Sequence, residues 1–514
     1  ADSFITMPKS SDSTSIVSGS GLILLGTIFE LGIAFIAKIF IARFLGTYAY
    51  GLVSIGIIIL SISTTFVLLG LHHGLARYLP RLTSPESRKG ILISAFSITV
   101  LTSLIFGSIL FFFSEQIAIF IFSNESLSPI LKIFAIALPF TAFIRMVVGG
   151  LQGIKRASTT VFIKNIILPV SRFTLLIVVL IFGVSAIRVA WAYTLAYAVT
   201  ALVGIYAIYK YTELFYRVEP AYHFNDLIKF SSPLAISTMM ALLFVDADTI
   251  LLAYFHTASE VGIYAVIFPL SALLIVFLNS FNFLSMPILS ELHSQNKLLR
   301  MGEMYSIVSK WIFIPTFPIF LALFFFPEVL IQFFFGNAYI SGSVGLSILS
   351  IGFLFNAITG LNETTLLALG KTKYLLFNST VAGILNIILN ILLIPEYSFV
   401  GAAIATTVSY VCINLLNSMA LYRMTGILPF SKPLIKLGTI ATIAASSIYV
   451  LFVVLSLNNT GLLLSSILFT FVYFIAIIVS ESIGPEEEFL LSHFESLTGV
   501  NLNGIRYLIR LFSQ

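Results

Sequence analysis

The stretch AFIAKIFIARFLGTYAYGL, residues 34–52, decides how the rest of the chain is interpreted. It begins inside a long apolar segment, carries the cations Lys38 and Arg43, and ends at a predicted glycine turn. A similar stretch, LAYFHTASEVGIYA, follows about 211 residues later, at 252–265. There the charges ahead of the turn are acidic, Asp246 and Asp248. The sequence therefore predicts two related halves whose first spans carry charges of opposite sign.

Composition excludes a soluble domain. Hydrophobic residues make up 59% of the 514 residues and charged residues only 10%, against roughly 25% charged in soluble domains. A mean hydropathy of +1.06 places most of the chain in lipid. A helical span needs about 20 apolar residues, and the apolar blocks allow about fourteen spans. They lack the alternation of a membrane barrel, so we expect an all-α polytopic membrane protein.

The predicted spans and connections divide the chain into six regions. A polar tail precedes two six-helix lobes joined by a cytoplasmic linker, and two additional transmembrane helices and an amphipathic cytoplasmic tail follow. Their expected bounds are 1–17, 18–210, 211–226, 227–425, 426–482 and 483–514.

Basic residues are distributed unevenly over the predicted loops. One alternate set of loops, with both termini, holds 19 of the 27 Lys and Arg residues, whereas the other set holds only Lys132 and Arg188. Cytoplasmic loops carry an excess of Lys and Arg. The pattern predicts a multi-pass protein of the cell membrane with both termini in the cytoplasm.

Two further pairs of segments support the repeat. LQGIKRAS at 151–158 matches LALGKTKY at 367–374, and VAWAYTLAY at 189–197 matches AAIATTVSY at 402–410. Two repeats of the same orientation predict a pseudo-two-fold axis along the membrane normal. Transporters built in this way place their site between the halves and rock one half against the other.

Five cations of the first half lie inside predicted spans. Each would cost about 2.5–3.5 kcal/mol if it faced lipid at mid-helix, and Glu30 is the one acid available to them in these spans. A water-filled cavity lined by them would attract an anion. Three of them, Arg43, Arg145 and Lys164, could instead snorkel to the interface. The five candidate substrate-binding cations are Lys38, Arg43, Arg145, Lys164 and Arg172.

The second half carries acids within its spans. Asp246 and Asp248 stand about 200° apart around a helix, so they cannot both face one partner. They could bind Na⁺ or exchange a proton as a coupling or gating site, or they could form a structural ion pair between the halves. Glu363, near the middle of the tenth predicted span, is a further candidate.

Polar residues at two other places are candidates for substrate contact. Asn386 and Asn390 share a helix stripe with Asn378. They could bind sugar hydroxyls or hold neighbouring helices together. Arg77 and Arg81 are four residues apart at the cytoplasmic end of the second span, where they could receive an anionic headgroup.

Several kinds of chemistry are excluded. The single cysteine, Cys412, rules out a disulfide framework, and His72 and His73 have no Cys or Glu cluster beside them for a metal. The GlyLysThr sequence at 370–372 has Thr365 where a phosphate loop requires glycine. We find no catalytic constellation, so we expect no enzyme, no cofactor and no nucleic-acid partner.

Three motifs resemble a known family. AlaArgPheLeuGly at 42–46 with TyrGly at 50–51 is similar to the first-span signature of polysaccharide-type (Wzx-like) flippases of the multidrug/oligosaccharidyl-lipid/polysaccharide exporter superfamily. AspThrIleLeuLeuAlaTyrPhe at 248–255 with ValGlyIleTyr at 261–264 resembles its seventh-span signature. LeuGlnGly at 151–153 with Lys155 resembles its fourth-loop motif. The chain departs from the family at His256, where a glycine is frequent.

The resemblance implies a V-shaped bundle of two six-helix lobes plus two helices. It implies export of a lipid-linked oligosaccharide, held by its phosphate or pyrophosphate, from the cytoplasmic to the external leaflet for surface polysaccharide or glycoprotein synthesis. Membrane lipids and the glycosyltransferases of the same pathway would be its partners. Only Arg43 of the five cations lies in a family motif. Two alternatives are a cation-coupled multidrug antiporter of the same superfamily and a non-transporting membrane scaffold.

Overall fold

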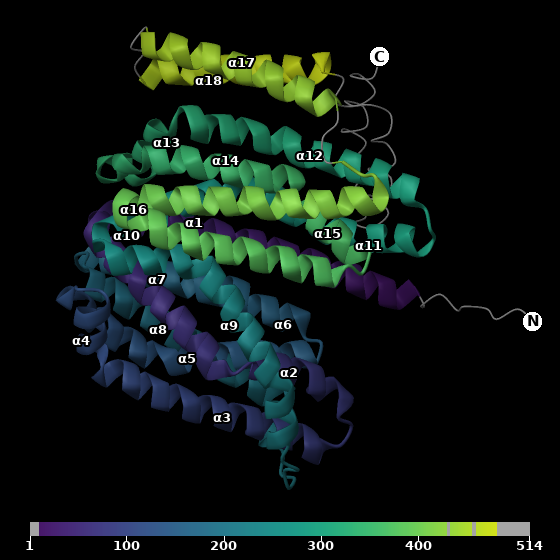
Figure 1. Ribbon diagram of the computed structural model, residues 1–514. Coiled ribbons are helices and arrows are strands. Elements are labelled where there is room, and N and C mark those ends of the chain that lie inside the picture. Colours follow the sequence, from purple (N-terminus) through teal and green to yellow (C-terminus); the bar gives the residue numbers. More distant parts are fainter. Residues whose placement is uncertain (1–9, 429–431, 455–458, 481–514) are drawn as a thin grey trace, which may run out of the picture. The chain divides into compact units, whose positions relative to one another are not determined.

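The structure is a computed structural model that describes residues 10–428, 432–454 and 459–480 (Figure 1). The regular elements of these residues are all helical, which confirms the predicted all-α fold. The predicted amphipathic tail and residues 1–9 of the predicted polar tail lie outside the described residues, and the first helix already begins at Ser10.

Ten helical segments among the described residues are long and apolar enough to cross a membrane. Two of these segments each contain two predicted spans joined by a turn. The first is α1 (Ser10–Leu68), which turns at Gly46 with a φ of 74°. The second is α16 (Thr372–Thr425), which turns at Ser398 with a φ of 53°. A membrane-spanning bundle is confirmed, and a total of fourteen spans stays a prediction.

The turn at Gly46 ends the first predicted span and lies inside the stretch that opened the sequence analysis. Only glycine adopts a positive φ without a steric cost, so the sequence explains the position of this turn. The turn at Ser398 occupies the gap between the eleventh and twelfth predicted spans.

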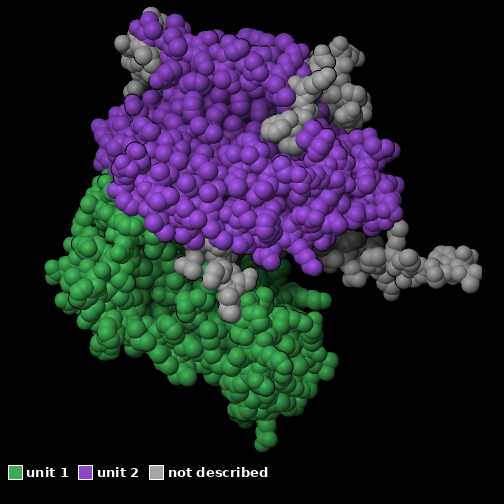
Figure 2. Space-filling view, viewed as in Figure 1, with its two compact units in different colours: residues 1–262 green, residues 263–514 purple. Residues whose placement is uncertain are grey.

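The chain forms two compact units, residues 1–262 and 263–514 (Figure 2). In the first unit, α5 packs against α1, α2, α3 and α8 and is buried along most of its length. Its apolar residues face neighbours on all sides, as expected of a central helix. Besides α1, the helices of this unit are α2 (Leu71–Tyr78), α3 (Pro85–Phe112), α4 (Ser114–Gln116), α5 (Ser128–Gly153), α6 (Ala157–Val161), α7 (Leu168–Phe182), α8 (Ala186–Tyr211) and α9 (Phe224–Phe255).

The second unit is built around α14, which packs against α12 and α16. Its apolar core includes Tyr305, Ile312 and Leu361. The helix α10 (Ala258–Ala272) begins at the end of the first unit and continues into the second. The other helices are α11 (Val276–Ser294), α12 (Leu298–Phe325), α13 (Pro327–Phe335), α14 (Ser343–Thr359), α15 (Leu361–Ala368), α17 (Lys432–Val454) and α18 (Asn459–Val479).

The helix α9, which is the seventh predicted span, belongs to the first unit. The sequence repeat assigns it to the second half, but α9 packs against α1 and α2. The boundary between the two compact units, after residue 262, therefore differs from the boundary between the two sequence repeats, which lies before α9.

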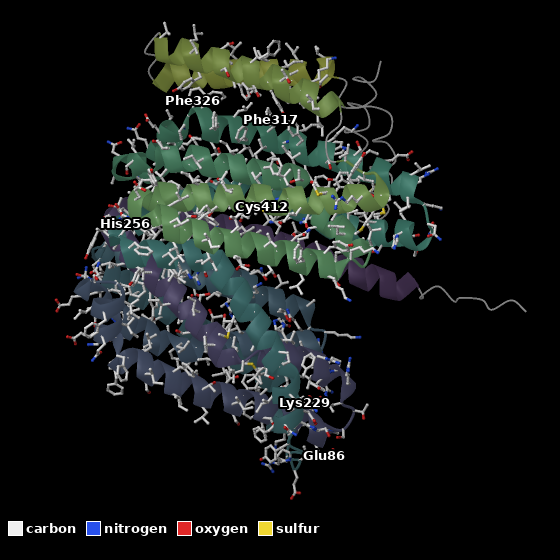
Figure 3. All side chains as sticks on the ribbon, viewed as in Figure 1. Glu86, Lys229, His256, Phe317, Phe326 and Cys412 are labelled. Carbon is white, nitrogen blue, oxygen red and sulfur yellow. The ribbon has the colours of Figure 1, made fainter. Side chains whose placement is uncertain are left out.

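The segment between α8 and α9 is docked onto the beginning of α3. Arg88 forms an ion pair of 2.6 Å with Glu213. The ammonium of Lys89 donates to the backbone oxygens of Tyr216 at 2.7 Å and Val218 at 3.0 Å. This end of the unit also holds Glu86 and Lys229 (Figure 3).

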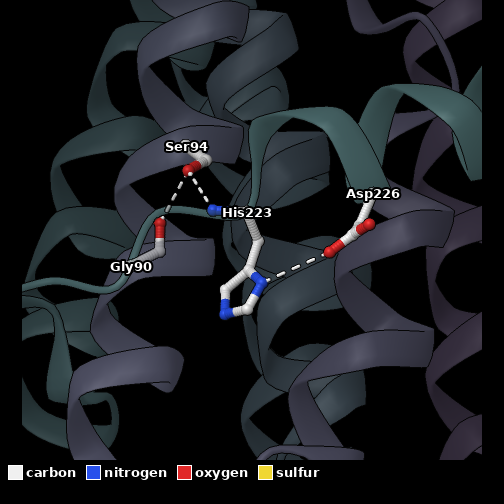
Figure 4. Close-up of polar contacts among 4 residues, drawn as sticks. All are labelled: Gly90, Ser94, His223 and Asp226. Carbon is white, nitrogen blue, oxygen red and sulfur yellow. Dashed lines mark hydrogen bonds and ion pairs between the residues drawn. The ribbon is translucent and has the colours of Figure 1, made fainter.

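The docking continues up to the first residues of α9. The backbone amide of Ala221 donates to the carbonyl of Glu86 at 3.0 Å, and that of His223 donates to the Ser94 hydroxyl at 3.2 Å (Figure 4). A side chain at Gly90 would collide with the carbonyl of Ala221. The predicted linker is thus held by side chains and backbone alike.

A close helix crossing joins α1 to α10. A Cβ on Gly51 would overlap the carbonyl oxygen of Ala258, and a Cβ on Gly262 would overlap that of Thr47. Gly262 follows Gly51, and Ala258 follows Thr47, by the 211 residues of the repeat. The glycine of each repeat therefore contacts the equivalent residue of the other repeat, as in a two-fold symmetric contact.

Candidate functional site

Arg172 of α7 is the centre of a polar cluster inside the first unit. Its Nη2 donates to the hydroxyl of Tyr197 at 3.1 Å. Its guanidinium carbon lies 4.6 Å from the ring centroid of Tyr193 and 5.3 Å from that of Tyr197. The two tyrosines are four residues apart on α8, so they present their rings on one face. They stabilise the guanidinium by cation–π contact and a hydrogen bond.

Two more of the predicted cations contribute to this cluster. Lys38, half-buried on α1, lies near enough to Arg172 for the two positive charges to repel each other. Arg145, half-buried on α5, lies near Tyr197. Arg172 of α7 and Arg145 of α5 thus lie near the tyrosine pair of α8, and Lys38 of α1 lies near Arg172. We call Lys38, Arg145, Arg172, Tyr193 and Tyr197 the cationic cluster.

One carboxylate partly compensates the cationic cluster. Glu30 of α1 attracts Arg172 electrostatically and accepts a hydrogen bond from the buried side chain of Asn165. The Nε of Arg172 is buried and has no hydrogen-bond partner. Three cations against one acid leave an excess of positive charge and an unused donor, which together suit an anion.

A local irregularity positions Asn165 and Arg172. The span from Ala157 to Phe182 contains a π-helical turn over Phe162–Ile167, immediately before Pro169 at the start of α7. Proline lacks the amide hydrogen that continues an α-helix, and π-turns of this kind often occur at functional sites.

The remaining two predicted cations have exposed side chains. Lys164 lies on the π-helical turn, next to the buried Asn165, and its side chain is exposed. Arg43 is exposed on α1, three residues before the turn at Gly46. The exposure of these two residues agrees with the alternative that they reach the membrane interface.

The acids lie in different units. Asp248 is buried and Asp246 half-buried on α9 of the first unit. The expectation that Glu363 is buried in mid-span is wrong, because its side chain is exposed. The span breaks at Gly360, and α15 restarts at Leu361. Glu363 lies in the first turn of the new helix, while its neighbour Asn362 is fully buried.

The asparagines of α16 bond to one another. Asn390 donates to Asn386 at 3.0 Å, and Asn378 donates to Asn417 at 2.8 Å. The second of these bonds joins the two halves of the α16 hairpin, and all four side chains are buried. This arrangement supports the alternative in which asparagines hold helices together.

At the predicted entrance, Arg77 and Arg81 are both exposed at the end of α2 and just beyond it. The guanidinium carbon of Arg77 lies 4.0 Å from the ring centroid of Phe230 on α9. Arg77 therefore joins α2 to α9 as well as carrying charge.

Sequence reasoning missed three residues of interest. Tyr193 and Tyr197 stand in the VAWAYTLAY segment, whose spacing of four could have placed both rings on one face. Lys310, buried on α12 of the second unit, is a cation inside a predicted span. Its helix also carries Tyr305, whose hydroxyl donates to Asn362 at 2.7 Å. Among the described residues there is no cluster of three or more His, Cys, Asp or Glu residues suited to a metal.

The fold and this site define a multi-pass helical membrane protein with a positively charged site between its helices. A model of the family described as "polysaccharide biosynthesis protein" matches residues 16–293, and the MatE model matches residues 233–392. The chain belongs to the polysaccharide biosynthesis protein family. The resemblance to polysaccharide-type flippases of the exporter superfamily is thereby confirmed.

Individual relatives agree with this assignment. The uncharacterized membrane protein MJ1375 of Methanocaldococcus jannaschii is 27% identical over 80% of this chain and 99% of its own length. The probable flippase AglR of Haloferax volcanii is 26% identical over 42% of this chain and 45% of its own length. The solved lipid II flippase MurJ, in an inward closed conformation, has a TM-score of 0.71 at 16% identity, covering 89% of this chain and 98% of that one. This last likeness concerns the fold.

Proposed function

We propose that the protein is a flippase that carries a lipid-linked oligosaccharide from the cytoplasmic to the external leaflet by alternating access, without ATP hydrolysis. Membership of the polysaccharide biosynthesis family supports a glycan substrate. The name of AglR, a probable flippase, supports a flippase function, and the likeness to MurJ supports the fold. Family and structural neighbours alike argue for transport and against an enzymatic function.

The observation that carries the proposal is the cationic cluster. A phosphate or pyrophosphate linker is the charged part of such a substrate, and guanidinium groups bind its oxygens through paired, charge-assisted hydrogen bonds. Arg172 offers a buried Nε without a partner, and Lys38 adds a second positive charge nearby. An anion between them would relieve their mutual repulsion.

The surrounding groups would keep the binding reversible. Tyr197 and Tyr193 hold the guanidinium of Arg172 in the absence of substrate, and Glu30 offsets part of its charge. A substrate phosphate has to displace or outweigh these contacts. A flippase requires such a balance, because it must release its cargo on the other side of the membrane.

The other residues predicted from the sequence have supporting roles in the proposal. Arg77 and Arg81 attract the headgroup at the cytoplasmic entrance, and Asp246 and Asp248 couple transport to Na⁺ or H⁺. Glycosyltransferases of the same pathway supply the substrate. The two sequence repeats act as the six-helix lobes that rock against each other. Asn386 and Asn390 already bond to each other, so we give them a structural role.

The test replaces two cations of the cluster. In a host whose surface glycan depends on this protein, the Lys38→Gln/Arg172→Gln variant should reduce glycan export at least tenfold. Its abundance in the membrane is measured in parallel, so that export is compared at equal amounts of folded protein. The matched control is Arg188→Gln, an exposed arginine that donates to the carbonyls of Phe182 and Gly183. Export by the double variant at the level of the control would refute the proposal.

A second candidate is a cation-coupled multidrug antiporter. The match of the MatE model over residues 233–392, which include Asp246 and Asp248, favours it. A cationic drug would be repelled by the cationic cluster, so this candidate function does not explain why the first unit contains that cluster. It predicts drug resistance that depends on the two aspartates and is insensitive to the Lys38→Gln/Arg172→Gln change.

A further inference from the structure

A second group of cations gathers at the ends of α5 and α8, around a single tyrosine ring. The guanidinium carbon of Arg156 lies 4.8 Å from the ring centroid of Tyr211, and the ammonium of Lys210 lies 5.3 Å from it. Lys210 also lies 5.8 Å from the ring of Tyr206. Lys155 adjoins Arg156 in the same loop. We call Lys155, Arg156, Tyr206, Lys210 and Tyr211 the Tyr211 patch.

The charges of the Tyr211 patch are exposed and lack acidic partners. Lys155, Arg156 and Lys210 all have exposed side chains. None of the three pairs with a carboxylate among the residues that the structure describes. The nearby acid Glu213 is engaged by Arg88. Cation–π contacts hold the positive charges near one ring, although they repel one another.

The backbone conformation at Lys155 indicates that the lysine has a role other than forming the turn. Lys155 has a φ of 57°, in the left-handed region, where any residue other than glycine is strained. Its amide donates to the carbonyl of Gln152, and the amide of Arg156 donates to that of Leu151. This is the helix ending that normally has glycine at its left-handed residue.

The second repeat provides an internal comparison. In LALGKTKY the residue at the same place in the turn is Gly370, with a φ of 70°. It lies one position before Lys371, which the sequence match pairs with Lys155. The amide of Gly370 donates to the carbonyl of Leu367, and the amide of Lys371 donates to that of Leu366. The same turn is therefore built with glycine in one repeat and with lysine in the other. Lys155 therefore adds a cation to the first unit at a position where the backbone conformation favours glycine.

We infer that the Tyr211 patch binds the anionic phosphate headgroup of a membrane lipid. The patch lies at the ends of membrane-spanning helices, where tyrosines sit at headgroup level. Clusters of Lys and Arg at this depth attract anionic lipids. The three cations, which have no carboxylate partner among the described residues, suit a phosphate. The two aromatic rings, which are at most partly buried, suit the interfacial region around it. The leaflet is the one that the loop charges predict to be cytoplasmic.

This lipid is distinct from the transported substrate, and the inference does not depend on the proposed function. The Tyr211 patch uses no residue of the cationic cluster. Its three cations are exposed, whereas the side chains of the cationic cluster are buried or half-buried. A lipid held here would anchor the ends of α5 and α8 to one leaflet.

Native mass spectrometry of the full-length protein can test the inference. The protein is titrated with phosphatidylglycerol, with phosphatidylcholine and with inorganic phosphate. Wild type should retain phosphatidylglycerol in preference to phosphatidylcholine. The Arg156→Gln/Lys210→Gln variant should bind phosphatidylglycerol roughly 30-fold more weakly, about fivefold for each cation. The matched control, Lys297→Gln/Arg300→Gln, removes two exposed cations from another loop and should bind as wild type does.

The Lys155→Gly variant distinguishes a loss of lipid binding from a loss of stability. Glycine relieves the left-handed backbone, so the thermal midpoint should stay the same or rise while phosphatidylglycerol binding falls about fivefold. Equal lipid binding by wild type and the Arg156→Gln/Lys210→Gln variant would overturn the inference. So would saturation of the patch by inorganic phosphate without a preference for phosphatidylglycerol, since that result would assign it to a soluble anion.

Discussion

Tyr197 lies beside two cations of the cationic cluster, because its hydroxyl accepts a hydrogen bond from Arg172 and Arg145 lies nearby. Tyr197→Phe removes the acceptor and keeps the ring. A hydrogen bond to a charged group contributes about 1.5–3 kcal/mol. Because the substrate must displace this bond, the variant should bind substrate roughly tenfold or more tightly, and its transport at saturating substrate should fall because release slows. Tyr193→Phe is the matched control, since Tyr193 contacts Arg172 through its ring. Transport assays in proteoliposomes measure both, and equal losses would contradict a specific role for the Tyr197 hydroxyl.

Asp246 and Asp248 differ in burial, and this difference separates their expected roles. Asp248 has an exposed fraction of 4%, whereas Asp246 is half-buried. A buried carboxylate in the membrane requires a cation or a proton. We expect Asp248→Asn to abolish the dependence of transport on a Na⁺ or H⁺ gradient, and Asp246→Asn to change it less. Flux measured under imposed gradients decides the point, and unchanged dependence in both variants would make them structural.

At the scale of elements, the docked segment between α8 and α9 is open to a direct test. Gly90→Val places a side chain against the carbonyl of Ala221, so the segment should detach from α3 and become sensitive to protease. Limited proteolysis should cut the variant between residues 212 and 223 at least several-fold faster than wild type. Gly32→Ala is the control, since a Cβ there meets no atom within 4 Å. Equal cutting rates would mean that backbone bonds alone hold the segment.

The helices and turns were easier to predict from the sequence than the burial of individual charges. Hydropathy identified the spans, and the turn residues Gly46 and Ser398 fall where two pairs of predicted spans meet. The repeat offset is visible in the contacts of Gly51 and Gly262. Burial of individual charges was harder to predict. Glu363 is exposed three residues after the helix is interrupted at Gly360, and Lys164 is exposed on a π-helical turn whose next residue, Asn165, is buried. Periodicity assumes regular helices, so it fails at such breaks.

The arrangement of the whole molecule across the membrane can be tested with a single-cysteine design. The chain has one cysteine, Cys412, so a Cys412→Ser background is free of thiols. In this background we expect Glu125→Cys to react with a membrane-impermeant maleimide on intact cells. Arg217→Cys should react only after permeabilisation. Both side chains are exposed, so access and not burial determines labelling. The reverse pattern would invert the predicted topology.

The docked segment before α9 also bears on how the protein is made. A chain emerges from the ribosome with its N-terminal part first, and compact parts assemble in that order. Residues 1–262 form one compact unit, and Arg88, Lys89 and Ser94 bind the segment that leads into α9. All the partners of these contacts have been synthesised before α10 is complete. The first seven spans can therefore assemble in the membrane while the second half is still being translated.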